Sequence, residues 1–184
     1  MVFGLALSLG ALVLINAPVT DTGHLYLGLF VFGFSFVILV TVWYSYSTIM
    51  AVLPVETRLL VVANLVLLFV VALEPYLLYV FAGNGSNAVG ETASVLYAID
   101  LAVMNAVLGG FLHILSREGK HLVTAPNPRK MRVRRNLTFV LCAVFLLSAL
   151  PPFWTWIWWP GVPSRVILWM LTLPAGWIVR TLNR

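Results

Sequence analysis

Two carboxyl groups stand out among the residues that could do chemistry, because both lie inside apolar segments. Glu74 falls in the stretch of residues 58–82, and Asp100 falls in the stretch of residues 92–115. If these stretches pack as antiparallel helices, the two acids lie at a similar depth. A carboxylate inside a membrane is costly and commonly marks a binding site or a proton relay. The structural alternative is a hydrogen bond to a neighbouring helix, to Asn105 or to a tyrosine hydroxyl.

A second candidate site lies near the start of the chain. Leu5, Leu9 and Leu12 are spaced at i, i+4 and i+7, so they form one stripe on a helix, with Ser8 beside it. The neighbouring glycines and alanines are small enough to let membrane helices approach closely. An apolar stripe alone is typical of ordinary packing, so the spacing does not by itself assign a function.

Other kinds of chemistry are not indicated by the sequence. Cys142 is the only cysteine, so no internal disulfide and no cysteine-based metal site are expected. The chain contains no His-Glu-x-x-His zinc pattern and no glycine loop that would cradle a phosphate. We therefore predict neither an enzyme nor a bound cofactor or metal. The clustering of basic residues in one segment argues against nucleic-acid binding and indicates membrane topology.

The composition determines which elements must position these residues. Of the 184 residues, 61% are hydrophobic and 9% are charged, which predicts that lipid is the surrounding solvent. Spanning the hydrocarbon layer takes about 20 helical residues, and most of the apolar stretches approach that length. We predict one all-α membrane domain over residues 1–184, a six-helix transmembrane bundle. The expected helices are residues 2–18, 24–53, 58–82, 92–115, 137–159 and 166–182.

The basic residues predict the orientation of this bundle. With both termini cytoplasmic, ten of the eleven Lys and Arg residues lie inside and only Arg165 lies outside. Seven of them fall between Arg117 and Arg135, which we expect to form a cytoplasmic loop. An alternative for residues 2–18 is a cleaved signal peptide, although no basic residue precedes its apolar core. A start upstream of Met1 is a further alternative.

Residues 2–14, Val-Phe-Gly-Leu-Ala-Leu-Ser-Leu-Gly-Ala-Leu-Val-Leu, resemble the first helix of prokaryotic relatives of the transmembrane protein 175 potassium channel family. Residues 96–101, Leu-Tyr-Ala-Ile-Asp-Leu, are similar to a Leu-Tyr-Ala-Leu-Asn-Leu run in the same family. The aromatic-rich end of the second stretch, with Trp43, and the basic connection before the fifth are also similar. The resemblance covers most of the chain through soft, mostly apolar motifs.

The resemblance implies a homotetramer in the lipid bilayer, with the first helix of each subunit lining a pore for potassium and other monovalent cations. Leu5, Leu9 and Leu12 would then form the constriction, and Ser8 would supply the hydroxyl layer. Apolar constrictions can gate by dewetting. The implied location is a cell membrane, the plasma membrane of a prokaryote.

Two departures from the family pattern leave other functions open. The family's Phe-Ser-Asp signature, expected just before Val2, is absent, and Tyr46-Ser47 stand where relatives carry a His-His pair. Asp100 occupies a position where relatives tend to have Asn. The alternatives to a channel are a small proton-coupled carrier that uses Glu74 and Asp100, and a non-conducting membrane scaffold of the same fold.

Overall fold

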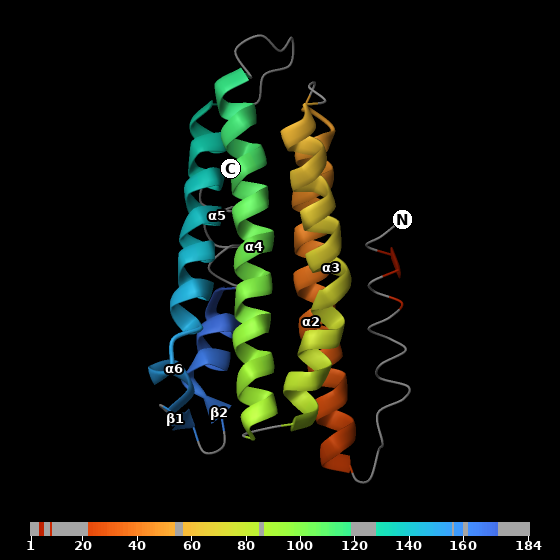
Figure 1. Cartoon of the computed structure of the whole chain (residues 1–184), viewed down its shortest axis with the longest axis vertical. Helices are drawn as coiled ribbons and strands as arrows, with labels where there is room; N and C mark the ends of the chain where they lie inside the picture. The colour runs from red at the N-terminus through yellow and green to blue at the C-terminus, as the bar shows by residue number, and fades with distance from the viewer. Residues whose placement is uncertain are drawn as a thin grey trace.

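The computed structural model describes residues 4, 5, 8, 22–53, 57–84, 87–118, 128–155, 157–159 and 162–172. Four long helices dominate this part of the chain and run alternately up and down (Figure 1). They are α2 (Thr22–Met50), α3 (Arg58–Asn84), α4 (Ala88–Glu118) and α5 (Pro128–Ser148). A short helix, α6 (Pro152–Thr155), and a two-stranded antiparallel sheet of β1 (Ile157–Trp159) and β2 (Val162–Pro163) follow. Residues 164–172 are helical again.

Local sequence signals explain where several of these helices begin and end. The Thr57 hydroxyl accepts a hydrogen bond from the amide of Leu60 at 3.3 Å at the start of α3. The Asn87 side chain accepts one from the amide of Gly90 at 2.9 Å at the start of α4. Both residues act as N-caps for amides that have no partner within the helix. α5 ends at Ser148, shortly before Pro151 and Pro152, which cannot continue a helix.

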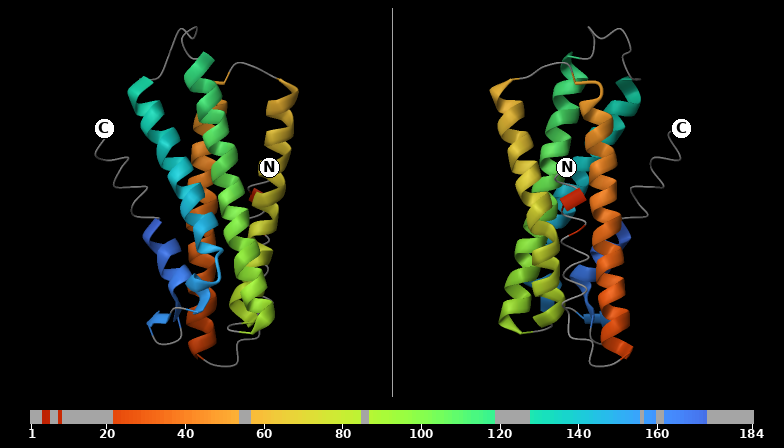
Figure 2. Two further views of the ribbon diagram at one scale, coloured as in Figure 1. Left: turned by 60° about the vertical axis from the view of Figure 1, so that its left-hand side comes forward. Right: turned by 90° about the vertical axis from the view of Figure 1, so that its right-hand side faces the viewer.

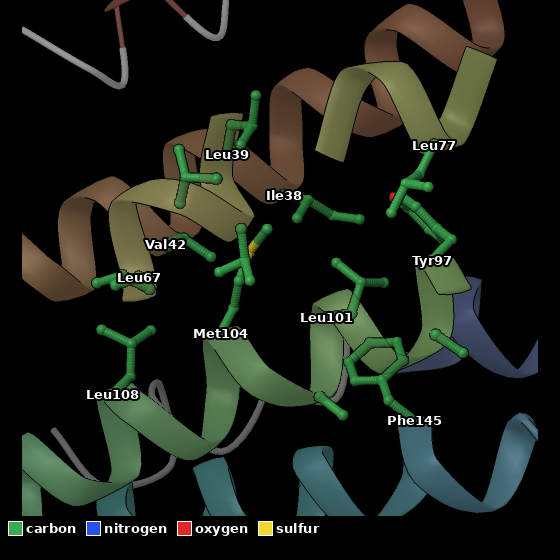
Figure 3. Packing of buried hydrophobic residues seen from close by; sticks show 14 of the residues in the cluster. Ile38, Leu39, Val42, Leu67, Leu77, Tyr97, Leu101, Met104, Leu108 and Phe145 are labelled. Carbon is green, nitrogen blue, oxygen red and sulfur yellow. The ribbon is translucent and has the colours of Figure 1, made fainter. Parts of the chain in front are cut away.

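The helices pack unevenly around α4. α4 contacts both α3 and α5 extensively, whereas α2 makes sparser contacts with α3 and α4 (Figure 2). Gly109 on α4 allows close contact with α5, because a Cβ atom there would lie 2.9 Å from the Phe139 ring. The buried core gathers where α2, α3 and α4 meet, and Figure 3 shows part of it, including Ile38, Leu67 and Met104.

Three of the described helices are long and apolar enough to cross a membrane. The candidate spans are Phe32–Met50, Arg58–Gly83 and Ala88–Ser116, which correspond to the second, third and fourth stretches predicted from the sequence. Large apolar side chains on these helices are exposed at the surface of the bundle, including Phe36, Leu65 and Phe69. Such a surface suits lipid rather than water. The chain is therefore a helical protein with the features of a membrane protein.

The fifth predicted helix differs from the structure at both ends. The sequence predicted residues 137–159, but α5 covers Pro128–Ser148. The predicted start is too late because the sequence pattern assigns a run of Arg and Lys to a loop, although both residue types favour helix. The predicted end is too late because apolar residues continue along the sequence past Pro151 and Pro152, where the helix has already stopped. The predicted first helix, residues 2–18, lies outside the described residues except for residues 4, 5 and 8, which are helical.

Candidate functional site

Glu74 is the centre of a polar network buried between three helices. Its side chain lies on α3 and is 0% exposed. The Ser35 hydroxyl on α2 donates a hydrogen bond to Glu74 Oε2 at 2.7 Å. The Tyr97 hydroxyl on α4 donates one to Glu74 Oε1 at 3.0 Å. Each carboxyl oxygen therefore has a donor, and the network ties α2, α3 and α4 together at one depth.

Asp100 lies on the same face of α4 as Tyr97, because the two residues are three positions apart. It is 4% exposed, and Glu74 is an electrostatic neighbour of its carboxyl group. Within the described part of the chain, neither Asp100 carboxyl oxygen has a hydrogen-bond partner. A buried polar group without a partner costs about 1–3 kcal/mol, and more when it is charged. The two acids thus share one site but have very different environments.

The surroundings of the acid pair are apolar. Leu77, Leu101 and Ile38 lie around Tyr97 in the core, as the close view shows (Figure 3). The indole of Trp169 packs against the Tyr97 ring, with 5.1 Å between the ring centroids. Electrostatic interactions are stronger in such a low-dielectric setting than in water. A cation or a proton bound between Glu74 and Asp100 would accordingly be held strongly.

Arg165 forms the other buried charged site, at the end of the bundle where α5 ends. Its side chain is 0% exposed. It donates hydrogen bonds to the carbonyl oxygens of Ser148 at 2.5 Å, Ala149 at 3.2 Å and Leu150 at 3.3 Å, and also to the Ser94 hydroxyl on α4. The guanidinium thus caps the C-terminal end of α5 through the Ser148 carbonyl and also binds the carbonyl groups of the two residues that follow the helix.

The charge of Arg165 is preserved at this position. Burial lowers the pKa of the guanidinium from its ordinary value, while the negative charge of Glu91 acts in the opposite direction. The ordinary pKa of an arginine side chain is so far above neutral that the group stays charged in proteins. Arg165 is best understood as a structural cap that joins the ends of α4 and α5 to the helical residues 164–172.

The residues of the predicted pore stripe are only partly described. Leu5 is 59% exposed. Ser8 is also exposed, and its hydroxyl donates a hydrogen bond to the Gly4 carbonyl at 2.9 Å. Leu9 and Leu12 lie outside the described residues. Of this stripe and its neighbouring hydroxyl, the structure thus describes only Leu5 and Ser8, and both are exposed.

The sequence alone indicated part of the acid site and none of the arginine site. A tyrosine hydroxyl was one of the expected structural partners for the acids, and Tyr97 fills this role for Glu74. Asn105 instead donates a hydrogen bond to the Leu101 carbonyl at 2.8 Å within α4. Ser35 was missed, and no spacing signal links it to Glu74, which is 39 residues away. From the sequence, Arg165 is expected only as a charge in an outer loop.

The described residues contain no cluster of three or more His, Cys, Asp or Glu side chains that could hold a metal ion. Fold and site together define a class, a helical membrane protein with a buried acid pair in its spans. No protein-family model, curated protein or solved structure matches the chain. The functional argument therefore depends on the geometry of this molecule.

Proposed function

We propose that the chain is a small proton-coupled membrane carrier in which Glu74 and Asp100 bind the proton or the transported cation. The single observation that carries this proposal is Asp100, a buried acid in an apolar span whose two oxygens have no partner among the described residues. Structural carboxyl groups in membranes are normally paired with other groups, whereas acids in binding and relay sites must exchange their partner.

The two acids have different roles in this proposal. Glu74 is held in place by the Ser35 and Tyr97 hydroxyls, so it serves as the fixed member of the pair. Asp100 is the exchanging member, because no protein hydrogen bond among the described residues has to break when it takes up or releases its ligand. The negative charge of Glu74 strengthens the binding of a cation at Asp100, and this effect is large in a low-dielectric core.

The membrane topology proposed here has six spans and both termini on the cytoplasmic side. The orientation is supported by the basic residues at the end of the bundle where α3 and α5 begin, and this end lies at the top of Figure 1. That end contains Arg58 at the start of α3 and five basic residues in the first turns of α5. The opposite end contains Arg165, which is buried and capped. This asymmetry follows the positive-inside rule.

Proton flux into liposomes tests the carrier. Purified protein is reconstituted with a trapped pH-sensitive dye, and a potassium gradient with valinomycin drives proton movement. The wild type should move protons, and Asp100→Asn should lower the flux at least about tenfold, equivalent to about 1.4 kcal/mol. Glu91→Gln is the matched control, because it makes the same carboxyl-to-amide change on α4 about 13 Å from Asp100 along the helix axis.

Two results would count against the carrier. The first is no proton or cation movement by the wild type, which would favour a membrane scaffold. The second is an Asp100→Asn protein with unchanged flux and unchanged pH dependence. Asn is also the residue typical of the potassium channel family that the sequence resembles, so this variant should leave a channel conducting.

A potassium channel is the second candidate, and the exposure of Leu5 favours it. A leucine that its own bundle leaves 59% exposed near the start of the chain is available for contact with other copies. In this proposal the chain is a divergent homotetrameric relative of the transmembrane protein 175 family, with Leu5, Leu9 and Leu12 facing the axis. A ring of leucines leaves little room for water and acts as a barrier to ions.

Recording from planar bilayers with potassium and sodium on opposite sides tests the channel. Leu5→Ala should widen the constriction, increasing the leak and reducing the discrimination between the two ions. Ser8→Ala should alter selectivity more than conductance. Leu7→Ala is the control, since Leu7 lies about 160° from Leu9 around a helix. Equal effects of Leu5→Ala and Leu7→Ala, or no single-channel events at all, would exclude the pore.

A further inference from the structure

A cavity of about 260 Å³ lies between α2, α4 and α5, with Thr172 also in its lining. Its walls are mostly apolar and include Leu101, Leu108 and Phe145. Along α2 the lining extends from Val37 to Ile49, a length of about 18 Å at 1.5 Å per residue. A long, mostly apolar space of this kind suits an aliphatic chain better than a compact polar solute.

The polar groups of this cavity include one cation, Arg134. The Arg134 side chain is half-buried and lies on the second turn of α5. Thr138 also lines the cavity, one turn further along α5. Its hydroxyl donates a hydrogen bond to the Arg134 carbonyl oxygen at 2.9 Å. Ile49, near the end of α2, lines the cavity as well, so the space reaches the end of the bundle where the basic residues gather.

The packing of α4 against α5 places Arg134 near the edge of the apolar layer. Gly109 lies against Phe139, and the Arg135 guanidinium lies 3.4 Å from His113 Nδ1. The two pairs define one antiparallel register, in which Ser116 is level with about Arg132. Ser116 is the last residue of the candidate span of α4. By this register Arg134 is level with about Ile114 and lies within one helical turn of the end of the candidate span.

The first two turns of α5 have an excess of positive charge, which attracts anionic groups. They contain five basic residues, and the whole helix contains no Asp or Glu: the basic residues are Arg129, Lys130, Arg132, Arg134 and Arg135. Positive charges are unfavourable at a helix N-terminus, where the backbone dipole already presents partial positive charge. Anionic lipid headgroups attract basic segments next to membrane helices and fit basic pockets between them.

We propose that this cavity binds one anionic phospholipid from the leaflet at the basic end, with an acyl chain between α2, α4 and α5 and the headgroup phosphate at Arg134. The cavity, its lining and its position all fit this ligand, and the excess positive charge of α5 favours a negative headgroup. The lipid would fill the gap left where α2 packs sparsely. This site is separate from Glu74 and Asp100, which are not among the residues lining the cavity.

Native mass spectrometry of the purified protein in detergent tests the site. The protein is titrated with dioleoyl phosphatidylglycerol and, separately, with dioleoyl phosphatidylcholine, which has the same chains. The wild type should bind the anionic lipid at least fivefold more tightly, and Arg134→Gln should reduce that preference about fivefold. Arg132→Gln is the matched control, because Arg132 is exposed and lies about 200° away from Arg134 around α5.

A second variant tests the acyl-chain part of the site. Thr41 lines the cavity from α2, and Thr41→Phe should fill part of it and weaken the binding of both dioleoyl lipids. A short-chain phosphatidylglycerol should bind more weakly than the dioleoyl form to the wild type. Equal loss of binding in Arg132→Gln and Arg134→Gln would mean a diffuse charged surface and overturn the proposal. Binding without preference for the anionic lipid, or no binding because another segment fills the cavity, would also overturn it.

Discussion

Arg165 and Asp100 are both buried charged residues, but their environments are opposite. Arg165 donates hydrogen bonds to three carbonyl oxygens and one hydroxyl at the end of α5. Asp100 has no hydrogen-bond partner among the residues that the structure describes. One charged group completes a helix terminus, whereas the other stands in the middle of an apolar span. The difference separates a charge that stabilises the fold from one that the fold must tolerate.

This comparison explains why burial alone does not identify a functional residue. A buried ion that satisfies orphan backbone groups contributes to folding, and its removal leaves those groups without partners. A buried ion without partners lowers stability, so its presence calls for another reason, such as ligand binding. The hydrogen-bond pattern, rather than the exposure, therefore supports a structural role for Arg165 and is the basis of the functional role proposed for Asp100.

The largest effect is expected for Arg165→Ala. This change removes four hydrogen bonds, including those to the buried Ser148 carbonyl and to the Ser94 hydroxyl. The free energy of unfolding should fall by about 3–5 kcal/mol. Thermal unfolding followed by size-exclusion chromatography in detergent measures the loss. Arg132→Ala, on the exposed face of α5, is the control and should change the midpoint little. Similar unfolding midpoints for Arg165→Ala and Arg132→Ala would show that the hydrogen bonds of Arg165 do not stabilise the fold.

The next effect has the opposite sign. Asp100→Leu replaces an unpaired buried carboxyl group with an apolar side chain in an apolar core, so the free energy of unfolding should rise by about 1–2 kcal/mol. The same chromatographic assay measures it, and proton flux should be lost in the same protein. A fall in stability as large as that of Arg165→Ala would mean that Asp100 has a structural partner and would break the comparison.

A smaller effect is expected at the partner of the other acid. Tyr97→Phe removes the hydroxyl that donates to Glu74 and should lower the free energy of unfolding by about 1 kcal/mol, the scale of hydrogen bonds between membrane helices. Tyr76→Phe is the control, because Tyr76 on α3 is 60% exposed. A double-mutant cycle with Glu74→Gln should show coupling between the two positions. Purely additive effects would argue against this hydrogen bond.

The smallest effect is expected for Glu91→Gln. Glu91 is an electrostatic neighbour of Arg165, but it is partly exposed in the first turn of α4. Ion pairs of this kind contribute about 0–1 kcal/mol, so the unfolding midpoint should shift only slightly. The shift should become smaller still at high salt. A loss comparable to that of Arg165→Ala would show that Arg165 depends on an ion pair rather than on its hydrogen bonds.

The middle of the chain was the part most predictable from sequence. The second, third and fourth predicted helices match α2, α3 and α4 to within a few residues at each end. Their apolar runs are long, and Thr57 and Asn87 are residue types that commonly act as N-caps, here at the starts of α3 and α4. Glu74 and Asp100 could also be identified, because an acidic residue within a long apolar run is evident from the sequence alone.

The start of α5 was less predictable. Hydropathy marks the boundary of an apolar run, but a helix can continue beyond that boundary into water or the headgroup layer. The basic residues from Arg129 to Arg135 have adequate helix propensity, and Pro128 is suited to the first helical position. Because these residues are helical, Arg134 lies at the cavity while Arg132 lies on the exposed face. A loop over the same residues would not fix these two opposite positions.

The sequence by itself predicted helices apolar enough to span a membrane, and the orientation of the chain stays a prediction from its charges. Long apolar runs require lipid, and the distribution of charge favours one orientation, because both effects sum over many residues regardless of how the helices pack. Only the tertiary structure decided which charges are satisfied. Arg165 meets carbonyl groups up to 17 residues away and Ser94, 71 residues away, and Glu74 meets Ser35, 39 residues away. Hydrogen bonds act over about 3 Å, so their partners are fixed by packing between helices rather than by spacing along the chain.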